Sequence, residues 1–277
     1  MSCEILTPKN KVLFFDLDKT LIDKDYQITD TRIIDSMGEM QVRGWVLGLN
    51  SDTPLSSLEI WSKRFGLKGP IIAEKGGVVM FNGEMHFNRD LQETFRKSRN
   101  EILEMAKKLP NSFVWEGDQV ELIRRGEKLP EAASSTAILI SNLRKIGTSF
   151  HIRKVESDGK LINDRQTYDN TLNKLRGSYP KISNLEIDEN PEYGIVILSS
   201  SEVNKRIGMM SVMKLASWTQ IGMVGDSDSD FVGHDIAVQY AVANSKDNYK
   251  QKADFLAKGT YTTGVKEVCD LLLQTGR

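Results

Sequence analysis

A short apolar segment that ends in two carboxylates constrains the fold of this chain more than any other feature. The segment, KVLFFDLDKT at residues 11–20, has a continuous apolar run rather than alternating apolar and polar positions. Such a run is typical of a strand that is buried on both faces, as in a parallel sheet. The strand leads directly into Asp16 and Asp18, so two charges follow a segment suited to a protein interior.

Helix and strand patterns alternate on both sides of a distinct middle section. Up to about residue 85, the order is strand, helix, strand, helix and then a pair of short strands. The last third returns to this alternation, with a helix predicted over residues 204–217 and a strand over residues 220–226. We therefore predict an α/β fold with a Rossmann-like parallel-sheet core.

The middle section predicts a smaller α/β domain that is inserted into this core. Helices are predicted over residues 91–109, 132–147 and 165–177. Short strands are predicted near residues 113–117, 120–125, 149–155 and 192–200. We expect the inserted domain to span residues 86–199, between core segments at residues 1–85 and 200–277.

Composition and charge favour a cytoplasmic protein that binds neither nucleic acid nor a membrane. In the 277 residues, 37 basic side chains nearly balance 38 acidic ones, so no net charge attracts nucleic acid or anionic lipid. The first residues lack a signal-peptide pattern, and no apolar stretch is long enough to span a membrane. Cys3 and Cys269 match no metal or redox motif, which suits free thiols in a reducing compartment.

Acidic and hydroxyl side chains lie where several predicted strands end. They are Asp16, Asp18 and Thr20 after the first strand, Asn50 to Asp52 after the second, and Asp226 to Asp230 after a late strand. In an open parallel sheet, ligands bind beyond these carboxyl ends. Carboxylates that converge there repel each other and call for a cation, and a set of oxygen ligands suits Mg²⁺. A magnesium ion so held would make a phosphoryl group open to attack by an aspartate.

The acidic segment GDSDSD at residues 225–230 could also belong to a calcium loop. That interpretation is weaker, because the glycine expected at the sixth loop position and the glutamate expected at the twelfth are missing. The joint occurrence of D-x-D-x-T, a lysine at a helix start and G-D-x-x-x-D, in this order, favours a catalytic site over chance matches.

These motifs, DLDKT with a distant lysine and GDSDSD, resemble those of the haloacid dehalogenase superfamily of phosphohydrolases. The segments AEKGGVVMFNGE (73–84) and VANSKDNYKQKADFLA (242–257) resemble the branch with a large α/β cap after the third core strand. That branch includes Cof-like sugar phosphatases, sucrose-phosphate and mannosyl-phosphoglycerate phosphatases, and archaeal phosphoglycolate phosphatases. The resemblance covers about residues 10–85 and 200–275, and it implies that the inserted domain is a cap.

The resemblance also implies a role for each matching residue. Asp16 would be the nucleophile, Asp18 the general acid and then the general base, and Thr20 would support the loop conformation. Lys205 would pair with the phosphoryl group and with Asp16, although neighbouring Arg206 is a rival for this role.

A magnesium ion is the cofactor that the resemblance implies. Its ligands would be Asp16, the backbone carbonyl of Asp18, and Asp226, while Asp230 would hold either Lys205 or a metal-bound water. Asn244 would fix the loop near the metal.

One triplet departs from the family pattern, and it affects how phosphate would be bound. Relatives usually place Thr or Ser after the second strand, whereas this chain has Asn50, Ser51 and Asp52. Either the amide of Asn50 or the hydroxyl of Ser51 would then donate to a phosphate oxygen. In the inserted domain, Arg153 shares a strand face with His151 and is a candidate for contact with substrate; the alternative is a solvated face.

The sequence therefore predicts a phosphoric monoester hydrolase: a magnesium-dependent phosphatase that acts on a small phosphorylated metabolite through an aspartyl phosphate. The candidates are sugar phosphates, phosphoglycolate and phosphoglycerate derivatives. Two alternatives stay open, a phosphomutase on the same scaffold and a catalytically weak binding or regulatory protein. The altered triplet at Asn50 is the feature that favours the weak homologue. The sequence names neither the substrate nor the oligomeric state.

Overall fold

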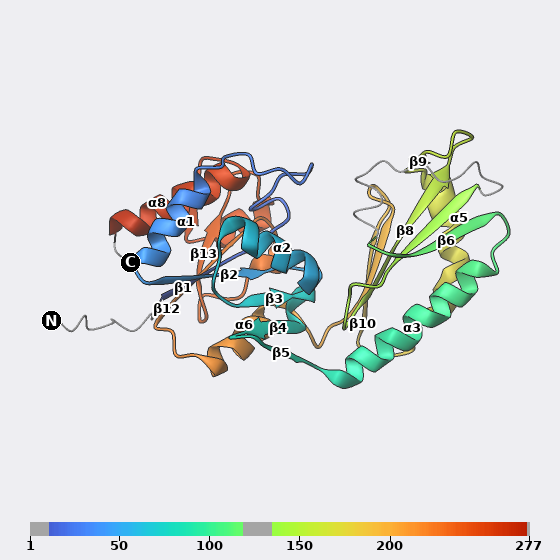
Figure 1. Cartoon of the computed structure of the whole chain (residues 1–277), viewed down its shortest axis with the longest axis horizontal. Coiled ribbons are helices and arrows are strands. Elements are labelled where there is room, and N and C mark those ends of the chain that lie inside the picture. The colour runs from blue at the N-terminus through green and yellow to red at the C-terminus, as the bar shows by residue number, and fades with distance from the viewer. Residues whose placement is uncertain (1–10, 119–134, 276–277) are drawn as a thin grey trace. The chain divides into compact units, whose positions relative to one another are not determined.

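The apolar run near the start of the chain forms a central strand of the larger sheet. This strand, β1 (Lys11–Phe15), pairs in parallel with β2 (Trp45–Asn50) on one side and β12 (Gln220–Gly225) on the other. The structure, a computed structural model, describes residues 11–118 and 135–275 (Figure 1). Val12 to Phe15 are fully buried, as expected for a strand that is covered on both faces.

The chain divides into two compact units, which we call the core unit (Met1–His86 and Val203–Arg277) and the inserted unit (Phe87–Glu202). The core unit contains an eight-stranded sheet in the order β14-β13-β12-β1-β2-β3-β4-β5. Its remaining strands are β3 (Ile71–Ala73), β4 (Val78–Phe81), β5 (Glu84–Phe87), β13 (Val238–Ala241) and β14 (Phe255–Leu256). The pairs from β14 to β3 are parallel, so these six strands end at one edge.

Helices of the core unit cover both faces of this sheet. They are α1 (Ile33–Val42), α2 (Leu55–Phe65), α6 (Lys205–Leu215), α7 (Asp247–Lys252) and α8 (Tyr261–Thr275). Val12 and Phe14 join an apolar cluster with Met209 and Val212 of α6. Because strand side chains alternate, Leu13 and Phe15 point to the opposite face. The predicted α/β fold with a parallel-sheet core is confirmed.

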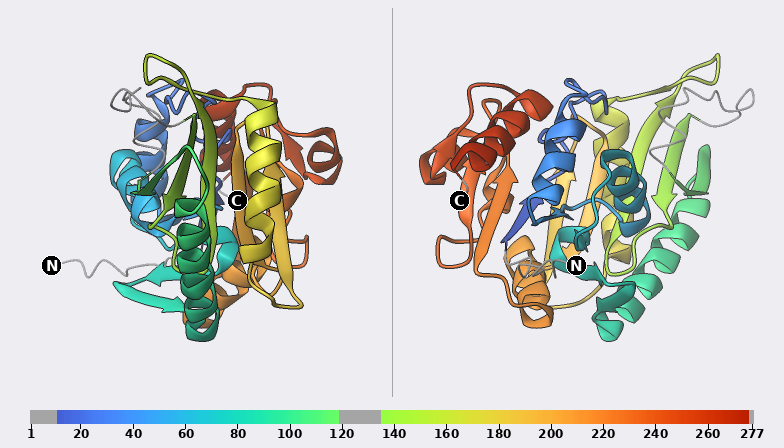
Figure 2. Two further views of the ribbon diagram at one scale, coloured as in Figure 1. Left: turned by 90° about the vertical axis from the view of Figure 1, so that its right-hand side faces the viewer. Right: turned by 60° about the vertical axis from the view of Figure 1, so that its left-hand side comes forward.

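The inserted unit is a second sheet with its helices on one side. Its strands are β6 (Ser112–Gly117), β7 (Thr136–Ser141), β8 (Thr148–Val155), β9 (Leu161–Ile162), β10 (Leu185–Asn190) and β11 (Ile195–Ser200). The main order is β10-β11-β8-β7-β6, and β9 pairs with β8. Helices α3 (Arg89–Lys107) and α5 (Arg165–Leu175) contact each other and β8, and they lie on the same side of the sheet (Figure 2).

The helix predicted over residues 132–147 is wrong, since the described part of this stretch forms strand β7 and a loop. Ala137 to Ile140 are fully buried between β6 and β8, and a short apolar run of this kind fits a buried helix or a buried strand equally well. Strand β10 was not predicted, because LEIDEN is a polar edge strand. The strand predicted near residues 120–125 lies outside the described residues.

The other elements predicted for the inserted domain agree with the structure to within a few residues. They are the helices over residues 91–109 and 165–177, and the strands near residues 113–117, 149–155 and 192–200. Within residues 11–118 and 135–275, none of the helices combines the length and apolar character that crossing a membrane requires.

Candidate active site

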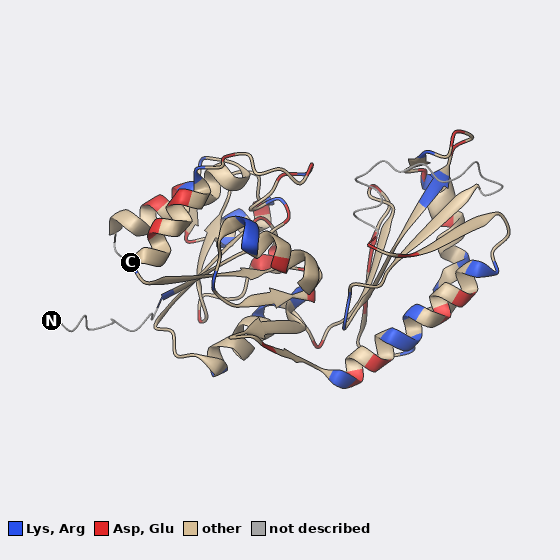
Figure 3. Cartoon of the chain, viewed as in Figure 1, with Lys and Arg blue, Asp and Glu red and all other residues tan. Residues whose placement is uncertain are grey.

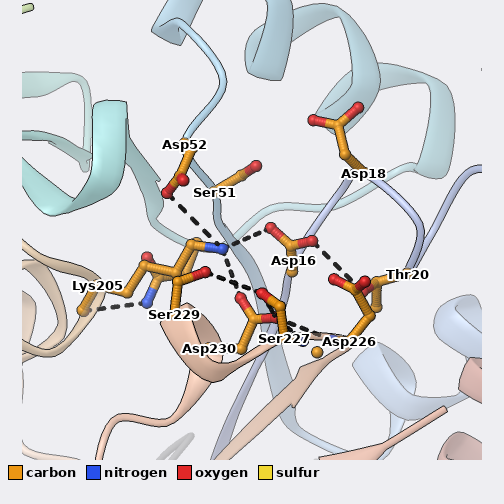
Figure 4. A network of polar contacts seen from close by, with 12 residues as sticks. Asp16, Asp18, Thr20, Ser51, Asp52, Lys205, Asp226, Ser227, Ser229 and Asp230 are labelled. Atoms are coloured by element: carbon orange, nitrogen blue, oxygen red, sulfur yellow. Dashed lines mark hydrogen bonds and ion pairs between the residues drawn. The ribbon is translucent and has the colours of Figure 1, made fainter. Parts of the chain in front are cut away.

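A buried lysine joins two carboxylates that come from different strands of the core sheet. Lys205 Nζ donates to Asp16 Oδ1 at 2.7 Å and to Asp230 Oδ1 at 2.5 Å (Figure 4). Asp16 directly follows β1, and its backbone N–H donates to Val224 of β12, which continues the parallel pairing by one residue. All three side chains are buried, so these charge-assisted hydrogen bonds form away from solvent.

Local capping places Lys205 at the first position of α6. The side chain of Asn204 accepts a hydrogen bond from the Ile207 N–H at 2.9 Å, which caps the helix. The backbone of Gly76, with φ 95°, approaches the Asn204 carbonyl so closely that a Cβ would collide with it. Arg206 instead pairs with Asp235 at 2.7 Å, so the structure brings Lys205, and not its rival, to the carboxylates.

The loop after β12 is organised by Asp230. Its Oδ2 accepts hydrogen bonds from the backbone N–H groups of Asp226 and Ser227, both at 2.9 Å, and the Ser227 side chain completes a capping box. A Cβ on Gly225 would collide with the Asp230 side chain, so glycine is required there. The spacing of G-D-x-x-x-D therefore has a local cause: the last aspartate folds back on the start of its own loop.

The core unit contains a carboxylate cluster that fits a divalent cation. One oxygen from each of Asp16, Asp226 and Asp230 lies within 4.8 Å of the other two. Burial raises the pKa of Asp16 well above its usual value, and the neighbouring carboxylates raise it further, against the opposing effect of Lys205. Burial, followed by the charge of Asp230, raises the pKa of Asp226 to about 7. This excess of negative charge on oxygen ligands matches the chemistry that Mg²⁺ requires.

The members of this cluster differ in how much of each carboxylate is already bonded. Asp230 uses both oxygens, one for Lys205 and the other for backbone N–H groups. The Asp226 carboxylate accepts no hydrogen bond from the described residues. Asp16 binds Lys205 through Oδ1, and its Oδ2 accepts a long hydrogen bond of 3.4 Å from Thr20. Asp16 and Asp226 thus have the greater capacity for a metal ion.

Lys205 keeps its charge in this setting. Burial alone would lower the pKa of its ammonium group, but the charges of Asp16 and Asp230 outweigh that effect and raise the pKa well above its usual value. A charged donor therefore lies 2.7 Å from Asp16 Oδ1.

Asp18 lies apart from the three clustered carboxylates. It is exposed, and its Oδ2 accepts a hydrogen bond from Thr53 Oγ1 at 2.8 Å. Figure 4 shows its side chain directed away from Lys205. The loop is fixed from the other side by Asn244, which donates to the Lys19 carbonyl at 2.7 Å. Lys19 has φ 63°, a left-handed conformation that this hydrogen bond helps to hold.

The three side chains of the unusual triplet after β2 lie in different environments and make different contacts. Asn50 is fully buried, and its amide donates to the backbone carbonyl of Lys205 at 3.2 Å. Ser51 is also buried and directly follows β2, the strand that pairs with β1. Asp52 turns its carboxylate toward Lys205 Nζ, at 3.9 Å. The sequence reasoning missed the contacts of Asp52 and Thr53, and the only signal for them was their position directly after the triplet.

Arg153 lies on β8 of the inserted unit and is built into that unit. Its guanidinium donates to the side-chain oxygen of Asn163 and, at 2.7 Å, to the Tyr193 carbonyl. His151 shares its strand face, and both side chains are only 7% exposed, so the alternative of a solvated face is wrong. Burial, and then the charge of Arg153, lowers the pKa of His151 to about 3. Contact between Arg153 and a substrate stays a prediction.

Buried carboxylates and a lysine at the carboxyl ends of a parallel sheet define a class of enzymes that act on phosphoryl groups. The sequence pattern of the haloacid dehalogenase-like hydrolases matches residues 13–268, and the chain belongs to this family. The prediction of a hydrolase of this superfamily is therefore confirmed. Members of the superfamily generally use a divalent metal, and the buried acidic cluster of the core unit is consistent with that use.

Individual relatives extend over nearly the whole chain. A phosphoglycolate phosphatase of Thermoplasma volcanium is 24% identical over 262 residues, which cover 93% of this chain and 96% of the relative. A solved haloacid dehalogenase-like hydrolase of Bacteroides thetaiotaomicron is 16% identical with a TM-score of 0.65, over 95% of this chain and 99% of its own. A solved subclass IIB sugar phosphatase is 14% identical with a TM-score of 0.59, and the match covers 96% of this chain and 99% of the sugar phosphatase.

Proposed function

We propose that this protein is a magnesium-dependent phosphatase that hydrolyses a small phosphorylated metabolite through an aspartyl phosphate on Asp16. The observation that carries the proposal is the buried Lys205, which bonds Asp16 and Asp230 at once. Family membership and the phosphatase names of the relatives support a phosphoric monoester hydrolase.

In the first step, an oxygen of Asp16 attacks phosphorus while the bond from phosphorus to the ester oxygen breaks. Asp18 donates its proton to the departing oxygen, so an alcohol leaves and Asp16 carries the phosphoryl group. In the second step, Asp18 removes a proton from water, the water oxygen attacks phosphorus, and inorganic phosphate and free Asp16 are released. The proton that Asp18 takes from water restores its acid form for the next turnover, and the hydrogen bond from Thr53 Oγ1 holds its carboxylate in place.

A magnesium ion would be held by the side chains of Asp16 and Asp226 and by the backbone carbonyl of Asp18, with Asp230 close by. When bound, it would neutralise phosphate oxygens and offset the repulsion among the carboxylates. Asp230 has a separate task that needs no metal, because it orients Lys205 and fixes the loop after β12.

Ser51 is our first candidate for hydrogen bonding to the phosphoryl group. The amide of Asn50 is already used by the Lys205 carbonyl, so Asn50 supports the start of α6. Thr20 would steady Asp16, and Arg153 in the inserted unit, which we propose to be a cap domain, would contact the rest of the substrate. The names of the relatives favour phosphoglycolate and sugar phosphates as first substrates to assay. A cytoplasmic location is part of the proposal and rests on the cysteine pattern.

The decisive experiment is hydrolysis of p-nitrophenyl phosphate by the wild-type protein and by Asp16→Asn, with magnesium and with a chelator. We expect Asp16→Asn to lose at least about a thousandfold in turnover, because the nucleophile is removed. The matched control is Asp247→Asn, an exposed carboxylate on α7, which should keep full activity. Retained turnover in Asp16→Asn would refute the mechanism. A separate product scan with sugar phosphates tests the phosphomutase, which would give isomerised sugar phosphate instead of inorganic phosphate.

A further inference from the structure

The inserted unit contains a cavity whose lining is rich in hydrogen-bond donors. The cavity has a volume of about 200 Å³ and lies between α3 and the loop that joins β7 to β8. The polar and charged side chains that line it are Gln92, Arg96 and Arg99 from α3, and Asn142, Arg144 and Lys145 from the loop. Figure 3 marks the Lys and Arg positions along α3 in blue and its Asp and Glu positions in red. Among the described residues, the lining contains no Asp or Glu, which points to a ligand with negative charge.

Arg144 is the strongest single donor in this cavity. Its Nε donates to Ser149 Oγ at 3.1 Å, which fixes the direction of the guanidinium. Its two terminal nitrogens have no hydrogen-bond partner among the described residues. An arginine that is anchored at Nε and open at the other end presents two parallel N–H donors, the arrangement that binds a phosphate or carboxylate group.

Arg99 supplies a second donor with an incomplete set of partners. Its Nε is buried and makes no hydrogen bond within the described residues, although Glu116 Oε1 lies 3.3 Å away. The terminal nitrogens of Arg99 have no hydrogen-bond partner there. Arg96, by contrast, is held by Glu93 through two hydrogen bonds of 2.7 and 2.8 Å. The terminal nitrogens of Arg144, and those of Arg99 beside its ion pair with Glu116, therefore remain for a ligand.

We propose that this cavity binds a small anion through a phosphate or carboxylate group, with Arg144 and Arg99 as its main ligands and Gln92 and Asn142 as further donors. The volume is below the range of most organic ligand pockets, so the ligand is small. The site lies wholly in the inserted unit, and it neither uses nor requires the carboxylate cluster of the core unit.

One wall of the cavity, α3, directly follows the first chain segment that joins the inserted unit to the core unit, and the other wall, the β7–β8 loop, lies beside β11, which precedes the second segment. Helix α3 begins at Arg89, just after the boundary at His86, and Gln92 lies in its first turn. The loop reaches Gly147, where a Cβ would lie 3.1 Å from the Leu198 carbonyl of β11. Strand β11 ends at Ser200, just before the boundary at Val203. A bound anion would therefore tie together α3 and the loop beside β11.

The test is a titration of the full chain, labelled with ¹⁵N, with inorganic phosphate and separately with malonate at constant ionic strength. We expect saturable shifts of the backbone amides of residues 92–99 and 142–147, with a Kd of about 1 mM or tighter for at least one probe. Shifts with malonate alone would assign the site to carboxylates, and shifts with phosphate alone to phosphate. Phosphate bound at the carboxylate cluster would be seen separately, at residues 16–20 and 226–230.

Two variants make the assignment specific. Arg144→Gln should weaken binding about tenfold or more, because a charge-assisted bidentate contact is lost. The matched control is Arg165→Gln, an arginine of α5 that is 70% exposed and pairs with Asp169, and it should bind as the wild type does. If Arg144→Gln does not fold, Arg99→Gln replaces it. Absence of saturable shifts with both probes, or equal binding by the cavity variant and Arg165→Gln, would overturn the proposal.

Discussion

The two units of this protein bury ionisable side chains in different ways. In the core unit, Asp16, Lys205 and Asp230 are buried together, and opposite charges lie 2.5 to 2.7 Å apart. In the inserted unit, His151 is buried beside Arg153, its Nδ1 has no hydrogen-bond partner among the described residues, and its pKa falls to about 3. In the core unit, the charges of Asp16 and Asp230 hold Lys205 in its charged form, whereas in the inserted unit burial keeps His151 neutral.

This difference explains why only the core group forms a sequence motif, whereas His151 and Arg153 were linked in the sequence by strand alternation alone. A charged cluster needs partners with fixed geometry, and those partners form motifs at strand ends. A buried neutral histidine needs only space within a sheet, so it leaves no pattern beyond an alternating strand. The difference also separates what each group can do: the core cluster can bind a metal and a phosphoryl group, while His151 couples stability to pH.

The largest effect is expected when the charge balance of the core unit is broken. Lys205→Met leaves Asp16, Asp226 and Asp230 without their buried cation, so we expect a loss of about 3–5 kcal/mol in the free energy of unfolding. Urea denaturation without magnesium measures this loss. Lys214→Met, an exposed lysine on the same helix, is the control and should change stability little. Equal stability of the two variants would show that the pairing is unimportant.

A smaller loss is expected for the inserted unit when Arg153 is replaced. Arg153→Met removes donors to Asn163 and to the Tyr193 carbonyl, and a hydrogen bond from a charged group contributes about 1.5–3 kcal/mol. We therefore expect the free energy of unfolding to fall by about 2–3 kcal/mol. An increased KM at unchanged kcat in the same variant would support contact with substrate. Unchanged values of both constants would count against that contact.

The pH dependence of stability distinguishes the two kinds of burial directly. The folded-state pKa of His151 is about 3, below the value of about 6.5 in an unfolded chain, so only the unfolded state binds this proton between the two values. The contribution of His151 to the free energy of unfolding is therefore fully present above about pH 6.5, and it is lost as pH falls toward the folded-state pKa of about 3. At pH 5 the loss is about 2 kcal/mol, from 1.36 kcal/mol for each pH unit.

The measurement is urea denaturation of the wild type and of His151→Gln between pH 5 and pH 7. The stability difference between these two proteins should change by about 2 kcal/mol over this range, because the variant lacks the titrating group. His86→Gln, which replaces an exposed histidine of β5, serves as the control. A difference that does not vary with pH would contradict neutral burial of His151.

The smallest effect concerns Asp52, which faces Lys205 at 3.9 Å and is about half exposed. Its negative charge opposes a phosphate dianion beside Lys205, so Asp52→Asn should bind inorganic phosphate a few times more tightly. Solvent screening keeps the change to about 1 kcal/mol or less. Calorimetry with phosphate and magnesium measures it, and Asp35→Asn on α1 is the control. Weaker binding by Asp52→Asn would indicate that this carboxylate accepts a hydrogen bond from the phosphoryl group.

Much of the fold and part of the site could be predicted because their causes are local. The buried strand at Val12 to Phe15 follows from a continuous apolar run, and the loop after β12 follows from hydrogen bonds within five residues. The strand β7 could not be predicted, because Ala137 to Ile140 fit a buried helix as well as a buried strand. The contacts of Asp52 and Thr53 were missed because they depend on side chains that are distant in sequence.

The sequence by itself determined the α/β class, the family, and the carboxylates and lysine that gather at one edge of the core sheet. Only the tertiary structure decided how they meet: Lys205 reaches Asp16 across 189 positions, and Asn244 reaches Lys19 across 225. It also decided that Asn50 turns its amide to the Lys205 backbone while Asp52 turns its carboxylate to the Lys205 ammonium. The reason is physical: periodicity and capping act over a few residues, whereas side-chain partners are chosen by packing among distant segments.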